Sequence, residues 1–148
     1  MKLTNNIKKQ ANRKKKGFTL IEIIVAVTIV IILSALAVPR VSAYISKAKE
    51  ASAISAGKQI FTAAMWSYSE NNDKFDVGKV TDSVEKTSNV KLSATSPVTV
   101  DSTNNKSVTI NFESDKKPYI LKINGDSNSY TIEDNSESTP TPVFDSSK

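Results

Sequence analysis

The first chemically informative feature of the sequence is a single carboxylate inside an apolar stretch. Glu22 lies in the segment KKKGFTLIEIIVAV, residues 14–27, five residues after Gly17. An acid at membrane depth is costly, about 2.5–3.5 kcal/mol at the bilayer centre and less near one end of a span. Glu22 therefore either reaches back to the nearby interface or has a partner, and both interpretations stay open at this point.

The residue types that are missing restrict the chemistry. The chain has no histidine and no cysteine. Thiolate nucleophiles, imidazole acid–base catalysis and zinc sites with His or Cys ligands are therefore excluded. No pair of carboxylates stands at a plausible catalytic spacing. We therefore expect neither an enzyme nor a bound cofactor or metal, and a membrane-anchored enzyme is the least favoured class.

The positive charge of the chain is concentrated at one end. Residues 1–17 carry seven basic side chains and no acid, which leaves 13 basic and 15 acidic residues in the remainder. The body of the protein is thus mildly acidic, and we expect no specific nucleic-acid partner. Basic residues beside an apolar span hold that end in the cytoplasm.

The element that must position Glu22 is an apolar span of membrane length. Phe18 to Val38 covers 21 residues, of which only Thr19, Glu22, Thr28 and Ser34 are polar. About 20 apolar residues cross the hydrocarbon core as a helix. A secretory signal peptide, with Ala35-Leu36-Ala37 as its cleavage site, and a buried core helix are the less favoured alternatives.

The span supplies no cationic partner for the acid. It contains neither lysine nor arginine, so a partner must come from another chain or be created by processing. A cut between Gly17 and Phe18 would remove the basic cluster and leave a free α-amine on Phe18, which is cationic at neutral pH. The mature chain would then begin with an ammonium group and carry a carboxylate four residues further on.

A helical pattern continues beyond the span. Pro39 removes one backbone hydrogen bond, but apolar residues recur after it at helical spacing, so we predict a kink at Pro39 within one long helix. The apolar positions are Tyr44, Ala48, Ala51, Ile54, Phe61, Ala64, Met65 and Tyr68. Gly57 interrupts this helix, either because another element approaches closely or at a simple cost of about 1 kcal/mol.

The C-terminal half of the chain predicts a small antiparallel sheet. Apolar and polar residues alternate in three segments, which is typical of half-buried strands. Their apolar positions are Val108, Ile110 and Phe112, then Tyr119, Leu121 and Ile123, then Tyr130 and Ile132. A short helix at 80–86 and a weak strand at 98–100 are also expected. A lone sheet needs a cover, which the helical stripe provides.

The resulting expectation is an α+β fold in which a long N-terminal helix packs on an antiparallel meander. The tail is rich in Ser, Thr, Pro and Asp, and we expect it to be flexible. The predicted segments are a leader at 1–17, a membrane half of the helix at 18–38, an amphipathic half at 39–72, a loop-and-sheet head at 73–135 and the tail at 136–148.

These features together resemble a known family. The run Lys15-Lys16-Gly17-Phe18-Thr19-Leu20-Ile21-Glu22, with a basic leader before it and a long apolar helix with a distal proline after it, looks like the prepilin cleavage signature of type IV pilins and type II secretion pseudopilins. The resemblance is strong over residues 13–50 and extends loosely to about residue 134.

The resemblance implies specific roles for three residues. A membrane peptidase would cut between Gly17 and Phe18 and N-methylate Phe18, and Glu22 would pair with the N-terminal amine of a neighbouring subunit during assembly. Three features depart from the usual pattern. The cysteine pair of many pilins is absent, which fits Gram-positive pilins and also some pseudopilins. The 17-residue leader is longer than that of the shortest pilin class, and Ile31 replaces a glycine often found at the fourteenth mature position. Local melting of the helix would then depend on Pro39.

Several functions fit this resemblance. The favoured one is a major pilin that polymerises with itself, starting as a single-pass protein of the cytoplasmic membrane and ending in a surface filament. The alternative is a type II secretion or DNA-uptake pseudopilin. A minor pilin is less favoured because such subunits often lack the acid at the position of Glu22. Calcium, which some pseudopilins bind, is not expected because the nearby acids lack ligand spacing; these are Asp115, Asp126, Glu133 and Asp134.

Overall fold

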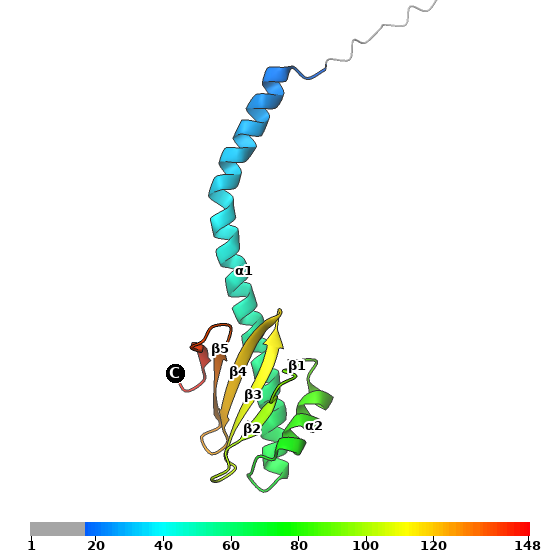
Figure 1. Ribbon diagram of the computed structural model, residues 1–148, viewed down its shortest axis with the longest axis vertical. Coiled ribbons are helices and arrows are strands. Elements are labelled where there is room, and N and C mark those ends of the chain that lie inside the picture. Colours follow the sequence, from blue (N-terminus) through cyan, green and yellow to red (C-terminus); the bar gives the residue numbers. More distant parts are fainter. Residues whose placement is uncertain (1–16) are drawn as a thin grey trace, which may run out of the picture. The chain divides into compact units, whose positions relative to one another are not determined.

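The computed structural model describes residues 17–148, which form two compact units. The first unit extends to Val41, and the second, which we call the head unit, comprises Ser42–Lys148. One helix, α1 (Leu20–Glu70, 51 residues), contributes to both. The remaining elements belong to the head unit (Figure 1). They are α2 (Val77–Thr87), β1 (Lys91–Leu92), β2 (Val98–Val100), β3 (Ser107–Ser114), β4 (Lys117–Asn124), β5 (Ser129–Asp134) and β6 (Thr141–Asp145).

The expected α+β class is confirmed: a long N-terminal helix accompanies a six-stranded antiparallel sheet. The sheet order is β1-β3-β4-β5-β6, and β2 pairs with another part of β3. The three strands expected from alternating residues are β3, β4 and β5, and the short strand at 98–100 is β2. The expected helix at 80–86 is α2, which is longer because Asp76 caps it by accepting a hydrogen bond from the Lys79 amide at 3.0 Å.

The core of the head unit lies between the sheet and the C-terminal half of α1. Alternate residues of β3, β4 and β5 are buried, as their pattern predicts. The ring of Phe61 on α1 stacks on Tyr130 of β5 with centroids 4.4 Å apart. The expected helix stripe is confirmed in part: Ala64 and Tyr68 are buried, and Ile54, Phe61 and Met65 pack partly buried against the core. Tyr44, Ala48 and Ala51 are instead exposed. The buried positions of the helix are Ala53, Gly57, Ile60, Ala63, Ala64, Ser67 and Tyr68.

The tail differs from its expected flexibility, because β6 adds an ordered strand to the sheet edge. Ile132 of β5 lies opposite Phe144 of β6, whose ring is 5.3 Å from that of Tyr130. Pro142 fits because an edge strand does not need every backbone N–H for the ladder. Composition predicted a mobile end, but Val143 and Phe144 pack partly buried against the core and contribute the apolar burial that holds this strand.

Two glycines allow close approach between α1 and the sheet. A Cβ on Gly57 would lie 2.5 Å from the terminal methyl of Ile132 in β5. Close approach of the sheet therefore explains this glycine, and its cost in helix propensity has a structural reason. A Cβ on Gly125, in the β4–β5 turn, would lie 2.6 Å from two ring carbons of Tyr68. The Tyr68 ring also packs on Phe75 at 4.6 Å, which limits its freedom to move.

Gly125→Ala is expected to destabilise the head unit by about 1–3 kcal/mol, the usual range for overpacking. Gly57→Ala should cost less, because the flexible end of Ile132 can move and alanine gains about 1 kcal/mol of helix propensity over glycine. Urea unfolding of the detergent-solubilised chain, followed by circular dichroism, measures both. The close approach to Tyr68 would be contradicted if Gly125→Ala were the milder change.

Candidate processing and assembly site

The peptide bond predicted to be cut lies outside the helix. Gly17, Phe18 and Thr19 have no helical assignment, and α1 begins at Leu20. The Phe18 side chain is 79% exposed. Apart from its chain neighbours, no described residue places an atom within 4 Å of a Cβ built on Gly17. Nothing in the described part of the chain therefore covers this bond or requires glycine at this position for steric reasons.

Three hydrogen bonds define the start of α1. The Thr19 carbonyl accepts from the Ile23 amide at 3.3 Å. The Thr19 hydroxyl accepts from the Glu22 amide at 3.3 Å, and a Glu22 carboxylate oxygen accepts from the Thr19 amide at 3.4 Å. This reciprocal pair is a capping box, in which the first and fourth residues satisfy each other's orphan backbone donors. Glu22 also places negative charge at the positive end of the helix dipole.

The capping box corrects one part of the sequence-based interpretation of Glu22. The sequence offers no lysine or arginine within the span as a charged partner. The structure gives the carboxylate a hydrogen-bond donor in its own chain, the backbone N–H of Thr19. The Thr-x-x-Glu spacing was the signal that could have revealed it. No described residue forms an ion pair with Glu22 within 17–148, so its charge has no compensating cation there.

The other polar side chains of the span are satisfied by the helix itself. The Thr28 hydroxyl donates to the Ile24 carbonyl at 2.8 Å, and the Ser34 hydroxyl donates to the Val30 carbonyl at 2.7 Å. Such back-bonding lets hydroxyl groups enter an apolar environment at low cost. Glu22 is therefore the one charged side chain of the span, and no described residue supplies a cation that pairs with it.

Pro39 lies inside α1, as the sequence predicted, and the helix continues through it. Proline has no amide proton, so the carbonyl of Ala35, four residues earlier, loses its usual donor. The predicted kink at this position stays a prediction. All residues of 20–52 are exposed, and α1 is the one helix among the described residues that is long and apolar enough to cross a membrane.

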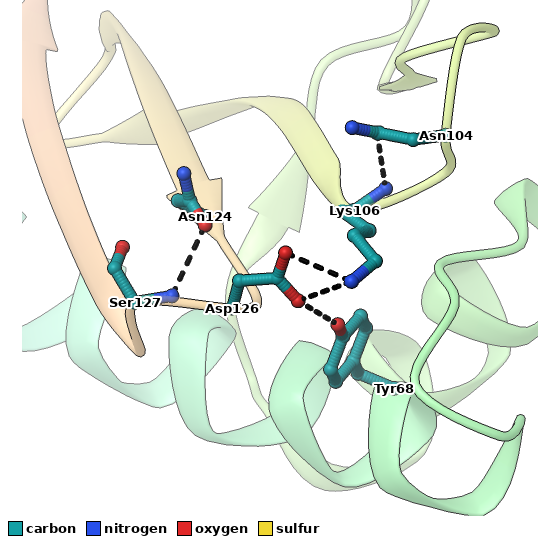
Figure 2. A network of polar contacts seen from close by, with 6 residues as sticks. All are labelled: Tyr68, Asn104, Lys106, Asn124, Asp126 and Ser127. Carbon is teal, nitrogen blue, oxygen red and sulfur yellow. Dashed lines mark hydrogen bonds and ion pairs between the residues drawn. The ribbon is translucent and has the colours of Figure 1, made fainter.

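A polar network closes the far end of the head unit, where α1 meets the β4–β5 turn (Figure 2). The Tyr68 hydroxyl donates to Asp126 at 3.1 Å, and the Lys106 ammonium donates to both oxygens of that carboxylate at 2.8 and 2.9 Å. The hydrogen bond from Lys106 holds the pKa of Asp126 below its ordinary value, and burial raises the pKa of Tyr68. This network fixes the turn on the helix end.

Acid is expected to destabilise the head unit through carboxylates of this kind. A pKa that is lower in the folded state than the ordinary 3.8 means stability that is present above pH 3.8 and lost as the pH falls through the folded value. The pKa of Asp134 is also lowered, chiefly by the Ser136 hydroxyl. The urea concentration at the unfolding midpoint should decrease as the pH is lowered below about 4, and Asp126→Asn should make this decrease smaller. If the midpoint of Asp126→Asn decreased with pH as much as that of the unaltered chain, the role of the network would be contradicted.

Within residues 17–148, no group of three or more acids is placed to hold a metal ion. The candidate site consists of an exposed peptide bond at Gly17–Phe18, a capped helix start at Thr19, and the Glu22 carboxylate, which has no ion-pair partner among the described residues. None of these groups performs chemistry by itself, but together they present a cleavable bond and a carboxylate at the head of an apolar helix.

Comparison with known proteins gives one match at this same segment. Residues 12–38 match a family model described as a prokaryotic N-terminal methylation motif. No curated protein and no solved structure matches the chain. The match covers the basic residues before Gly17, the Gly17–Phe18 bond, Glu22 and the apolar half of the helix, which are the features that carried the resemblance. Residues 12–38 therefore carry the class III signal peptide of type IV pilins, and this motif supports a type IV pilin-like or pseudopilin substrate of prepilin peptidase.

Proposed function

We propose that this protein is the structural subunit of a type IV pilus. In this proposal the leader, residues 1–17, is removed at the Gly17–Phe18 bond and Phe18 is N-methylated. The subunits then polymerise with one another through the N-terminal half of α1, which spans the membrane before assembly. The head unit forms the outer face of the filament, and the subunit's role is structural and needs no cofactor.

The exposure of the apolar half of α1 is the single observation that carries this proposal. Side chains along it are more than half exposed in most cases, for example Leu20 at 81%, Ile31 at 63% and Val38 at 61%. A helix that is apolar on all faces must be covered by lipid or by other helices. The head unit has its own core beginning at Ala53, so it does not require these side chains for its own burial.

The apolar helix and the methylation motif fit a membrane-anchored precursor that is later assembled, and each of these two stages has its own cover for the apolar surface. Lipid covers the span in the precursor. Other copies of the same helix cover it after assembly, where small residues such as Ala26, Ser34, Ala35 and Ala37 allow close helix packing. The same apolar surface therefore serves first as an anchor and then as the core of a polymer.

The proposed role of Glu22 follows from its charge. Burial of an uncompensated carboxylate in a helical bundle is costly. Pairing with an ammonium group offsets part of that cost, so the pair adds little net stability, but leaving either charge unpaired is strongly unfavourable. The only cation that processing adds is the amine of Phe18. Pairing between Glu22 of one subunit and Phe18 of its neighbour sets the register of the helices, because any other register leaves both charges unpaired.

Immunogold labelling tests the filament assignment. Antibodies against the head unit should decorate filaments on intact cells, and the labelled material should be released by shearing. A strain without the peptidase is the matched control and should show no labelled filament. If the processed protein stays in the membrane fraction and no filament is labelled, the chain is a pseudopilin and the pilus assignment is wrong.

A further inference from the structure

The capping box fixes the start of α1 relative to the Gly17–Phe18 bond, which is the bond proposed to be cut. Thr19 is the cap residue and Phe18 precedes it, so the Gly17–Phe18 bond lies just outside the first helical turn. A helix extended by two residues would engage the Gly17 carbonyl in an intrahelical bond with the Ile21 amide. A helix that frayed by one turn would leave the residues after the bond without a fixed conformation.

Both departures would impair recognition by a peptidase. A carbonyl held inside a helix is not accessible to a nucleophile, and a frayed segment must be ordered when it binds, at an entropic cost. The box opposes both because it satisfies the backbone donors of Thr19 and Glu22 at one defined helix start. It therefore leaves the bond in a non-helical segment that directly precedes a helix with a defined start.

We propose that the Thr19–Glu22 capping box positions the Gly17–Phe18 bond for prepilin peptidase, and that Thr19 is a positioning residue for the cleavage. This inference rests on the proposed processing of the precursor. It gives Glu22 a task before assembly, as a hydrogen-bond acceptor, that is separate from its later task as a charge. The two tasks can be separated because glutamine can close a capping box but carries no charge.

Cleavage kinetics of the full-length precursor by purified prepilin peptidase in detergent test the inference. Thr19→Val keeps the shape and removes the hydroxyl, and it should raise KM about five-fold with kcat little changed, which corresponds to the loss of about 1 kcal/mol for a missing cap. Thr19→Ser should restore KM. Thr28→Val is the matched control, because its hydroxyl donates to the Ile24 carbonyl of its own helix and takes no part in the capping box. It should behave as the unaltered chain does.

Variants of Glu22 distinguish the box from direct contact between Thr19 and the peptidase. Glu22→Ala breaks the box while leaving Thr19 in place, and it should raise KM as Thr19→Val does, whereas Glu22→Gln should not. The inference is overturned if Thr19→Val has the KM of the unaltered chain, if Thr19→Ser is as impaired as Thr19→Val, or if Glu22→Ala leaves KM unchanged. Failure of the unaltered chain to be cut would instead overturn the proposed function.

Discussion

Cells that express only the Glu22→Ala variant are expected to contain processed protein in the membrane and to carry no surface filaments. The reason is that the Phe18 amine of each incoming subunit would enter an apolar bundle without a counter-charge. An unpaired charge in such surroundings costs several kcal/mol, and the loss recurs at every subunit added. Electron microscopy of the cells and the mass of the membrane-bound protein measure the two halves of this result.

Glu22→Gln sharpens this experiment, because it keeps an oxygen that can accept the hydrogen bond from the Thr19 amide. It should be cut with normal kinetics and should still fail to assemble. Thr28→Val is again the control, since it removes a polar group of the span that bears no charge. Normal filaments from Glu22→Gln would show that charge pairing does not drive assembly.

A larger residue at position 17 is expected to block processing. In the Gly17→Val variant the precursor should keep residues 1–17, and filaments should be absent for that reason. Apart from its chain neighbours, no described residue places an atom within 4 Å of a Cβ added to Gly17. We expect the requirement for glycine to come from the peptidase, because a residue without a side chain allows a close approach to the backbone. The intact mass of the membrane protein measures the result.

The same variant carries its own control for folding. Because Gly17 contacts nothing in the described chain, the urea unfolding midpoint of the head unit should equal that of the unaltered protein. A variant that retained its leader but also unfolded at lower urea would point to misfolding as the cause. A cleaved Gly17→Val protein would contradict the assignment of the cleavage bond.

The sequence predicted those elements whose formation depends on local patterns. Period-two alternation located β3, β4 and β5, because half-buried strands must place apolar residues on one face. The apolar run of 18–38 and the helical spacing beyond Pro39 predicted one continuous helix, and α1 is continuous from Leu20 to Glu70. At the processing site, the residue types around Gly17 and Glu22 were sufficient to indicate the motif that the family comparison then confirmed.

The remaining features depend on contacts between distant segments. The tail has a composition typical of mobile ends, yet β6 forms because Phe144 finds a partly buried place beside Tyr130. The buried stripe of α1 begins at Ala53 and includes Gly57, since Ile132 of β5 packs there. The start of the buried stripe and the place of Gly57 in it could not be deduced from the periodicity of the helix alone. The capping box at Thr19 is the exception, because its Thr-x-x-Glu spacing is a local signal that a comparison of charges alone does not reveal.

The most direct test of the account is the mass of the N-terminal peptide from protein sheared off the cell surface. The account predicts a peptide that begins at Phe18 and carries one methyl group on its amine. This single result would establish cleavage after Gly17, methylation and export into a surface polymer. Sheared protein that still contained residues 1–17 would contradict the account, because Glu22 would then have no processed amine with which to pair.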